Sequence, residues 1–138
     1  MTTTATIEAM LRSHPERGGA AGPDLLVRAI RELADCEQAC VQCADACVGE
    51  HGGAELDACI QTDLACADAC AMTRRVLSRR TGQDPRLMAI VTEVCEELCS
   101  TCAAECERHA PHMRHCAECA ARCRACAEVC RDLLVAIA

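Results

Sequence analysis

The chain contains no phenylalanine, tryptophan or tyrosine among its 138 residues. Without aromatic side chains it offers no surface on which nucleic-acid bases or flat cofactors could stack. Its net charge of −7 also argues against a basic nucleic-acid footprint and indicates a soluble protein with an acidic exterior. We therefore expect no nucleic-acid partner.

Long apolar runs are missing as well. No stretch approaches the ~20 apolar residues of a membrane-spanning helix. Residues 1–22 contain neither the apolar core of a secretory signal nor a twin arginine. We expect a cytoplasmic protein with no membrane partner, a setting in which thiols stay reduced and dense cysteine usually indicates metal binding.

Cysteine, by contrast, is abundant, with sixteen in the chain. They fall into four blocks, and within each block the steps are three, four or, once, seven residues, which keeps the side chains on one face of a helix. These are the positions that leucine, isoleucine or valine normally occupy in a helical bundle. The candidate metal ligands are Cys36, Cys40, Cys43, Cys47, Cys59, Cys66, Cys70, Cys95, Cys99, Cys102, Cys106, Cys116, Cys119, Cys123, Cys126 and Cys130.

Glycine and proline divide the chain into helices. Residues 1–23 are predicted to hold a short amphipathic helix, with Ile7, Met10 and Leu11 on one face, followed by a linker. Residues 24–138 are predicted to hold four helices of about 25 residues joined by short loops. The expected fold is all-α, an antiparallel up-down-up-down four-helix bundle with a short N-terminal helix.

Local signals predict where the long helices begin and end. We expect Asp24 to cap the first, and Asp84, followed by proline, to cap the third. The second should cover residues 54–80. Because the residue before Pro111 is disfavoured in the α region, the third helix should end near His109 and the fourth should start at Pro111.

The alternating helix directions gather polar groups at one end of the bundle, here called the mouth. Continuing the three–four alternation by one step places His109 and His112 on the inner face, with the Met113 thioether nearby. His51 and His115 are predicted to be surface residues. The outermost thiols at the mouth are those of Cys47, Cys59, Cys106 and Cys116.

At the opposite end, here called the floor, the inner positions return to hydrocarbon. Between the two ends the pattern breaks once, where the second helix carries Asp63 between Cys59 and Cys66. Asp63 is either a solvated polar residue near the mouth or a carboxylate that attracts and passes on incoming cations. The floor residues are Leu26, Leu33, Leu77, Met88, Leu133 and Ile137.

Cysteines spaced in this way suit Cu(I). Residues three or four apart on a helix have Cβ atoms about 5–6 Å apart, and a metal held linearly between two thiolates needs sulfurs about 4.5 Å apart, taking bonds near ~2.3 Å. Soft thiolates select Cu(I). If each thiolate bridges two ions and each ion binds two thiolates, the chain holds roughly sixteen Cu(I) with no net charge.

Other interpretations of the thiols fit less well. Disulfides are disfavoured because the expected compartment keeps thiols reduced. Iron–sulfur clusters prefer loop spacings that are absent here. A purely structural role, with sixteen cysteines serving only as small core residues, would be unusual. A zinc or cadmium sink, with one cysteine from each helix in every site, is the strongest alternative. An enzyme is not expected, because a catalytic dithiol needs one or two exposed cysteines.

Two series of four cysteines, Cys36 to Cys47 and Cys95 to Cys106, occur in the chain together with a fourth helix that carries five cysteines. In this pattern the sequence resembles the bacterial copper storage proteins of the cytosolic branch. That resemblance implies multinuclear Cu(I) storage for copper buffering or detoxification, and assembly as a homotetramer. Candidate donors are a copper chaperone or a low-molecular-weight thiol. It further implies that copper enters at a mouth lined by His, Met or acidic residues, which in this sequence are Asp63, His109, His112 and Met113.

Overall fold

The computed structural model describes residues 3–16 and 18–138, and over that part the chain is helical, without strands. This confirms the all-α class. A short helix precedes four long ones, and a 3₁₀ turn leads into the second of them. The elements are α1 (Thr3–Ser13), α2 (Pro23–Gly49), η1 (Gly53–Leu56), α3 (Asp57–Ser78), α4 (Pro85–His109) and α5 (Arg114–Ile137).

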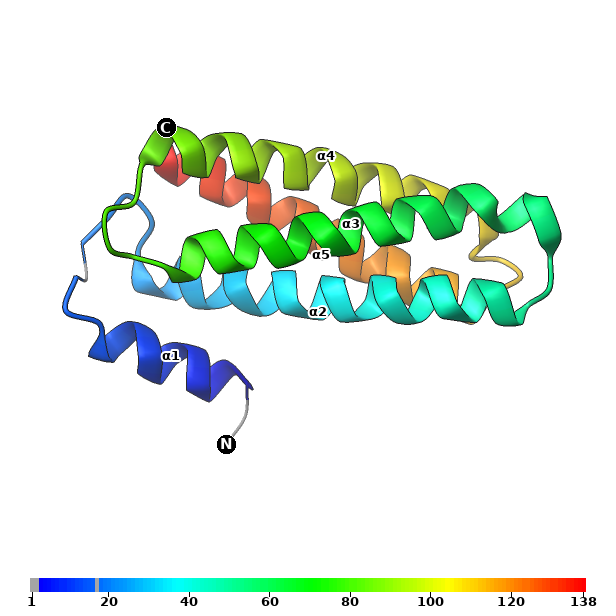
Figure 1. The fold of residues 1–138 in the computed structure, drawn as a ribbon, viewed down its shortest axis with the longest axis horizontal. Helices are drawn as coiled ribbons and strands as arrows, with labels where there is room; N and C mark the ends of the chain where they lie inside the picture. The colour runs from blue at the N-terminus through cyan, green and yellow to red at the C-terminus, as the bar shows by residue number, and fades with distance from the viewer. Residues whose placement is uncertain (1–2, 17) are drawn as a thin grey trace.

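The four long helices lie side by side, and the loops between them alternate between the two ends of the molecule, so that successive helices run in opposite directions (Figure 1). Each packs against two neighbours: α2 and α4 both contact α3 and α5. This closed ring is the expected four-helix bundle. α1 lies outside it and packs against α2. None of the described helices is long and apolar enough to cross a membrane.

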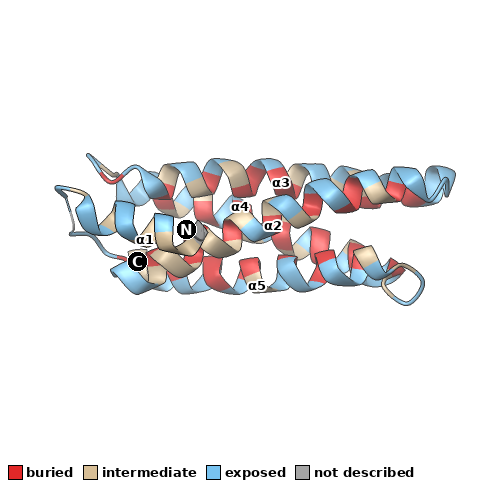
Figure 2. Ribbon diagram, turned by 90° about the horizontal axis from the view of Figure 1, so that it is seen from below, coloured by how far each residue is buried: buried red, intermediate tan, exposed pale blue. Residues whose placement is uncertain are grey.

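The inner faces of the helices form one buried core, and exposed residues lie on the outside (Figure 2). Every cysteine is at most 2% exposed, and small alanines such as Ala103 and Ala127 are buried in the same core. The hydrocarbon floor is also confirmed, since its leucines are buried, Met88 is 7% exposed and Ile137 packs against the core from its edge. The interior is therefore sulfur over most of its length and hydrocarbon at one end.

The caps of the long helices match the sequence only in part. Asp84 caps α4 as predicted, because its Oδ1 accepts a hydrogen bond from the Arg86 amide at 2.9 Å. The prediction of Asp24 as the cap of α2 is wrong: Gly22 holds that position, and Pro23 is the first helical residue. Proline suits that place, because its fixed φ is helical and it has no N–H to leave unbonded.

The turn between α4 and α5 differs from the prediction. α4 ends at His109 as expected, but Ala110 keeps helical angles (φ −53°, ψ −38°) although proline follows it. The amides of His112 and Met113 both bond the His109 carbonyl at 3.0 Å, closing a turn. The predicted start of the last helix at Pro111 is therefore wrong, because Met113 is the N-cap and α5 begins one residue later.

Candidate metal centre

The thiols form a connected network that crosses all four long helices. All sixteen cysteines are free, which argues against the disulfide alternative. Neighbouring sulfurs lie as close as 3.6 Å, as in the pairs Cys40–Cys123 and Cys66–Cys99. Cys36 on α2 reaches both Cys66 on α3 and Cys123 on α5 at 3.8 Å. A metal ion bound at any of these thiols would have other sulfurs next to it.

Within this network the sulfurs gather into groups of four in which all members lie within 4.8 Å of one another. Each group below takes two cysteines four residues apart on one helix and one from each of two other helices. Five of these groups are Cys36/Cys66/Cys70/Cys99, Cys36/Cys40/Cys66/Cys123, Cys40/Cys102/Cys119/Cys123, Cys43/Cys47/Cys59/Cys116 and Cys70/Cys95/Cys99/Cys126.

The groups overlap. Cys36 and Cys66, for example, belong to the first two groups alike, and Cys40 and Cys123 to the second and third. Separate four-cysteine sites could not all be filled at once, whereas thiolates that bridge neighbouring ions could serve every group. The zinc alternative, which expected one cysteine from each helix in every site, does not describe these five groups.

The protonation of two thiols at the mouth follows from their burial. At the mouth, burial raises the pKa of the Cys47 and Cys116 thiols, and the neighbouring Cys43 and Cys59 raise it further because adjacent thiolates repel. Without metal these two thiols are protonated. A metal ion that binds them must therefore displace their protons, so that affinity at the mouth rises with pH.

Asp63 lies inside the thiol core. It is fully buried, so the interpretation as a solvated residue near the mouth is wrong. Its Oδ1 accepts from the thiols of Cys102 at 3.0 Å and of Cys106 and Cys119 at 3.4 Å, while its Oδ2 is 3.9 Å from the Cys59 sulfur. Burial, with the Cys102 hydrogen bond second, raises the pKa of Asp63 to about 12. The carboxyl group thus ties α3 to thiols of α4 and α5.

The predicted mouth residues differ in burial. His109 ends the inner face of α4, is 8% exposed, and its Nε2 lies 3.3 Å from the Glu105 carboxylate. Met113 is partly buried against the core. His112 is exposed in the turn, so its predicted place on the inner face is wrong, because the chain is not helical there. His51 is exposed, as expected.

His115 is a second histidine whose predicted position is wrong. It was predicted to be a surface residue, yet its Nδ1 lies 3.4 Å from the Cys43 sulfur and 3.6 Å from that of Cys116. Its Nε2 is buried and 4.0 Å from the Glu50 carboxylate. His115 also lines a groove between α2 and α5, about 590 Å³ in volume, that reaches Cys43 and Cys119 from the side. Its position beside a mouth cysteine in the sequence was the available signal.

A helical bundle whose interior consists of reduced, overlapping thiol groups is a container for many soft metal ions. Residues 24–135 match the family model described as copper storage protein. The chain belongs to the copper storage protein family, as the cysteine pattern indicated. The role for which this family is named is storage, which is not catalysis.

Solved structures support the assignment. The copper storage protein Ccsp from Streptomyces lividans, loaded with 10 copper equivalents, has a TM-score of 0.88 and 41% identity, over 94% of this chain and 98% of that chain. A cytosolic copper storage protein from the same organism with five coppers has a TM-score of 0.80 and 45% identity, over 81% and 93% of the two chains.

One curated relative is the uncharacterized cysteine-rich protein YhjQ of Bacillus subtilis (strain 168). It is 34% identical over 104 residues, which cover 75% of this chain and 91% of that protein.

Proposed function

We propose that this chain stores Cu(I) in the cytoplasm, holding many ions through its sixteen cysteines to buffer or detoxify copper. The observation that carries this proposal is the overlap of buried four-cysteine groups along the bundle. Bridging thiolates use every sulfur twice, and one Cu(I) per thiolate leaves the buried core without net charge. Storage in the cytoplasm fits the free state of every cysteine.

Anaerobic titration of the reduced protein with Cu(I), against a chromophoric Cu(I) chelator, tests this function. We expect saturation at about one ion per cysteine. Saturation at four ions or fewer would contradict bridging and favour separate four-cysteine sites. A parallel titration with Zn(II) should give weaker binding that Cu(I) displaces.

A pair of variants on α2 sharpens this test. Cys40 belongs to two of the groups, so Cys40→Ser should lower the Cu(I) capacity by about one to two ions. Ala44, one turn further along the same helix, is 5% exposed and carries no ligand atom. Ala44→Ser changes the core to a similar extent and should leave the capacity unchanged.

We propose that copper enters at the mouth by way of His109, His112, Met113 and Asp63, and we add His115 to this set. Imidazole and thioether groups hold Cu(I) less firmly than paired thiolates, so they suit transfer rather than retention. The burial of His109 at the end of the α4 inner face and the contact of His115 with two thiols support their part. His112, exposed in the turn, would contribute least to this transfer. Asp63 would receive the ion among the thiols.

The copper donor is expected to be a copper chaperone or a low-molecular-weight thiol. Thiolate ligands of the donor would hold Cu(I) with the same soft chemistry as the core of this chain. The groove between α2 and α5 supports this proposal, because it brings the outside close to Cys43, Cys119 and His115. We propose no catalytic role, since every cysteine is at most 2% exposed and a catalytic thiol needs access to its substrate.

We further propose that the protein is a homotetramer. A stripe of apolar side chains on the outer face of α4 supports this assembly: Leu87, Ile90 and Val94 are 53%, 43% and 45% exposed. They recur at i, i+3 and i+7, which aligns them along one side of the helix. An exposed apolar stripe of this kind is typical of a helix that packs against another copy.

A further inference from the structure

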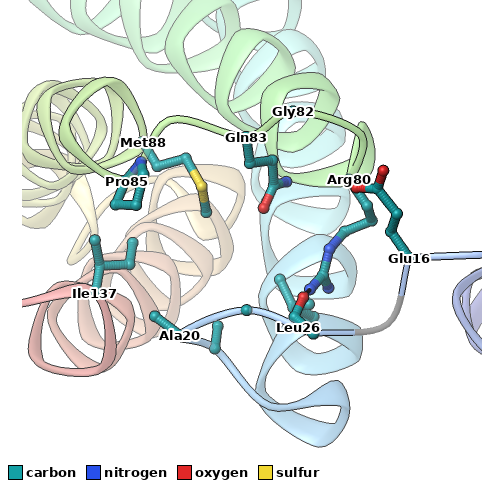
Figure 3. A pocket seen from close by; sticks show the side chains of 12 residues that line it. Glu16, Ala20, Leu26, Arg80, Gly82, Gln83, Pro85, Met88 and Ile137 are labelled. Atoms are coloured by element: carbon teal, nitrogen blue, oxygen red, sulfur yellow. Dashed lines mark hydrogen bonds between the residues drawn. The ribbon is translucent and has the colours of Figure 1, made fainter.

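A cavity of about 340 Å³ lies at the floor of the bundle, at the end opposite the mouth. It is bounded by the linker that precedes α2, by the loop between α3 and α4, and by the end of α5 (Figure 3). Its volume falls within the range of about 300–1,000 Å³ that is typical of small-molecule sites. Leu26, Met88 and Ile137 form its apolar side.

The polar side of this cavity carries a buried arginine. Arg80, just beyond the end of α3, is 8% exposed, and Figure 3 shows its side chain crossing toward the start of α2 and Leu26. Its Nη2 donates to the Gly18 carbonyl at 2.5 Å, but its Nε is buried and has no partner. Among the described residues no carboxylate forms an ion pair with it. A guanidinium group buried in this way retains its charge and lacks a counter-ion.

Three exposed residues that line the same cavity have backbone amides without a hydrogen-bond partner among the described residues. In the part of the chain that the structure describes, the amides of Gly19, Ala20 and Gly82 donate no hydrogen bond. Gly19 also allows the linker to approach the arginine: its φ is +141°, and a Cβ there would lie 2.7 Å from Arg80 Nη2. The close contact between linker and guanidinium group thus depends on this glycine.

From the Arg80 side chain, whose Nε lacks a partner, and the unbonded amides of three residues that line the same cavity, we infer that the floor of the bundle binds an oxyanion, a carboxylate or phosphate carried by a small molecule. The guanidinium fork matches the paired oxygens of either group. The apolar wall formed by Leu26, Met88 and Ile137 fits a short hydrocarbon body attached to it. This site is separate from the thiols, so it goes beyond copper storage.

Glu16 is the group within the chain that competes with such a ligand. It lines the cavity from the linker, is exposed, and forms no ion pair with Arg80 among the described residues. A bound oxyanion would be repelled by its carboxylate. Removing that charge should therefore strengthen the binding of the anion. This result would distinguish a ligand site from an internal ion pair between Glu16 and Arg80.

Thermal unfolding of the full-length reduced apo-protein, followed by far-UV circular dichroism, tests the inference. The sample is kept in dithiothreitol and Tris chloride, because common alternatives carry carboxylate or sulfonate groups. Inorganic phosphate and butyrate are compared with chloride at equal ionic strength. We expect one or both to raise the unfolding midpoint by about 3 °C or more beyond chloride. The preferred anion identifies the head group, and equal effects of all three would overturn the proposal.

Three variants assign the effect to the cavity. Arg80→Met keeps the aliphatic stem and should abolish the anion-dependent shift, whereas Arg79→Met, at the exposed neighbouring arginine, should keep it. Glu16→Gln should lower the anion concentration needed for half of the effect severalfold. A shift that persists in Arg80→Met would overturn the site.

Amide chemical shifts of the wild-type chain make the test independent of how Arg80→Met folds. Phosphate or butyrate should move the signals of Gly19, Ala20 and Gly82. Signals that stay in place would contradict the proposal.

Discussion

Asp63 places a carboxyl group where a bundle normally allows only apolar side chains. Its surroundings make it neutral in the metal-free protein, because burial raises its pKa to about 12. In the unfolded chain the same group ionises near its ordinary value of about 3.9. The folded state therefore binds more protons than the unfolded state at every pH between these values, and the contribution of Asp63 to stability falls as the pH rises above about 4.

Replacing Asp63 should remove this pH dependence. We expect the unfolding midpoint of the reduced apo-protein to decrease as the pH is raised from 5 to 7. Asp63 should lower the free energy of unfolding by up to about 1.4 kcal/mol per pH unit over this range. Asp63→Asn should flatten the slope and raise the stability at pH 7. Asp68→Asn, at an exposed position of the same helix, is the matched control and should retain it. Equal slopes for wild type and Asp63→Asn would show that the carboxyl group ionises inside the core.

The mouth histidines allow a comparison within one residue type. His109 and His115 are buried or touch thiols, while His112 is exposed in the turn. We expect His109→Ala and His115→Ala each to slow Cu(I) loading severalfold in stopped-flow measurements, because the ion loses a ligand next to its first thiolate. His112→Ala should change the rate least.

The Cu(I) capacity at the endpoint should stay nearly the same in all three variants, and a large loss of capacity would make the replaced residue a storage ligand. If His112→Ala slowed loading most, copper would be captured in the turn before it reaches the core.

At the scale of the helices, the sequence predicted most of the fold because its signals are local. Gly and Pro placed the loops, and the three–four cysteine steps identified the inner faces. The start of α5 was missed because the Pro111 rule describes an average preference, and here the turn bonds to His109 hold Ala110 in the helical region. That error placed His112 on the inner face.

Contacts between helices depend on their relative register, which spacing along one helix does not contain. For this reason the place of Asp63 on α3 was predictable, while its bonds to Cys102 and Cys119 were not. The same holds for the groups of four sulfurs. The sequence indicated that thiols face inward, but not that each group draws on three helices.

The outer face of α4 leads to a prediction about assembly. Ile90 and Val94 are 43% and 45% exposed and do not contribute to the core of the single bundle. Replacing both by Lys should dissociate the proposed tetramer, as measured by sedimentation or light scattering, because four charges per chain pair would meet at the interface. Helicity and copper capacity per chain should persist. The control is Val135→Lys on α5, which is 79% exposed. An unchanged mass for the α4 variant would place the interface on another face.

For the whole molecule, the decisive property is a core that can pack both without and with metal. Free cysteine behaves as a small hydrophobe when protonated, and the buried alanines and the leucine floor complete the packing. We expect the reduced apo-protein to be as helical as the copper-loaded form in far-UV circular dichroism. Copper should raise its unfolding midpoint, because ions that bind only the folded state stabilise it.

Since aromatic residues are absent, any near-UV signal that appears on loading comes from copper–thiolate bonds. The control is a sample titrated with Cu(I) after its thiols have been alkylated under denaturing conditions, which should show neither effect. An apo-protein that is largely unfolded until copper is added would mean that the metal organises the core, and that thiols alone pack too weakly to hold four helices together.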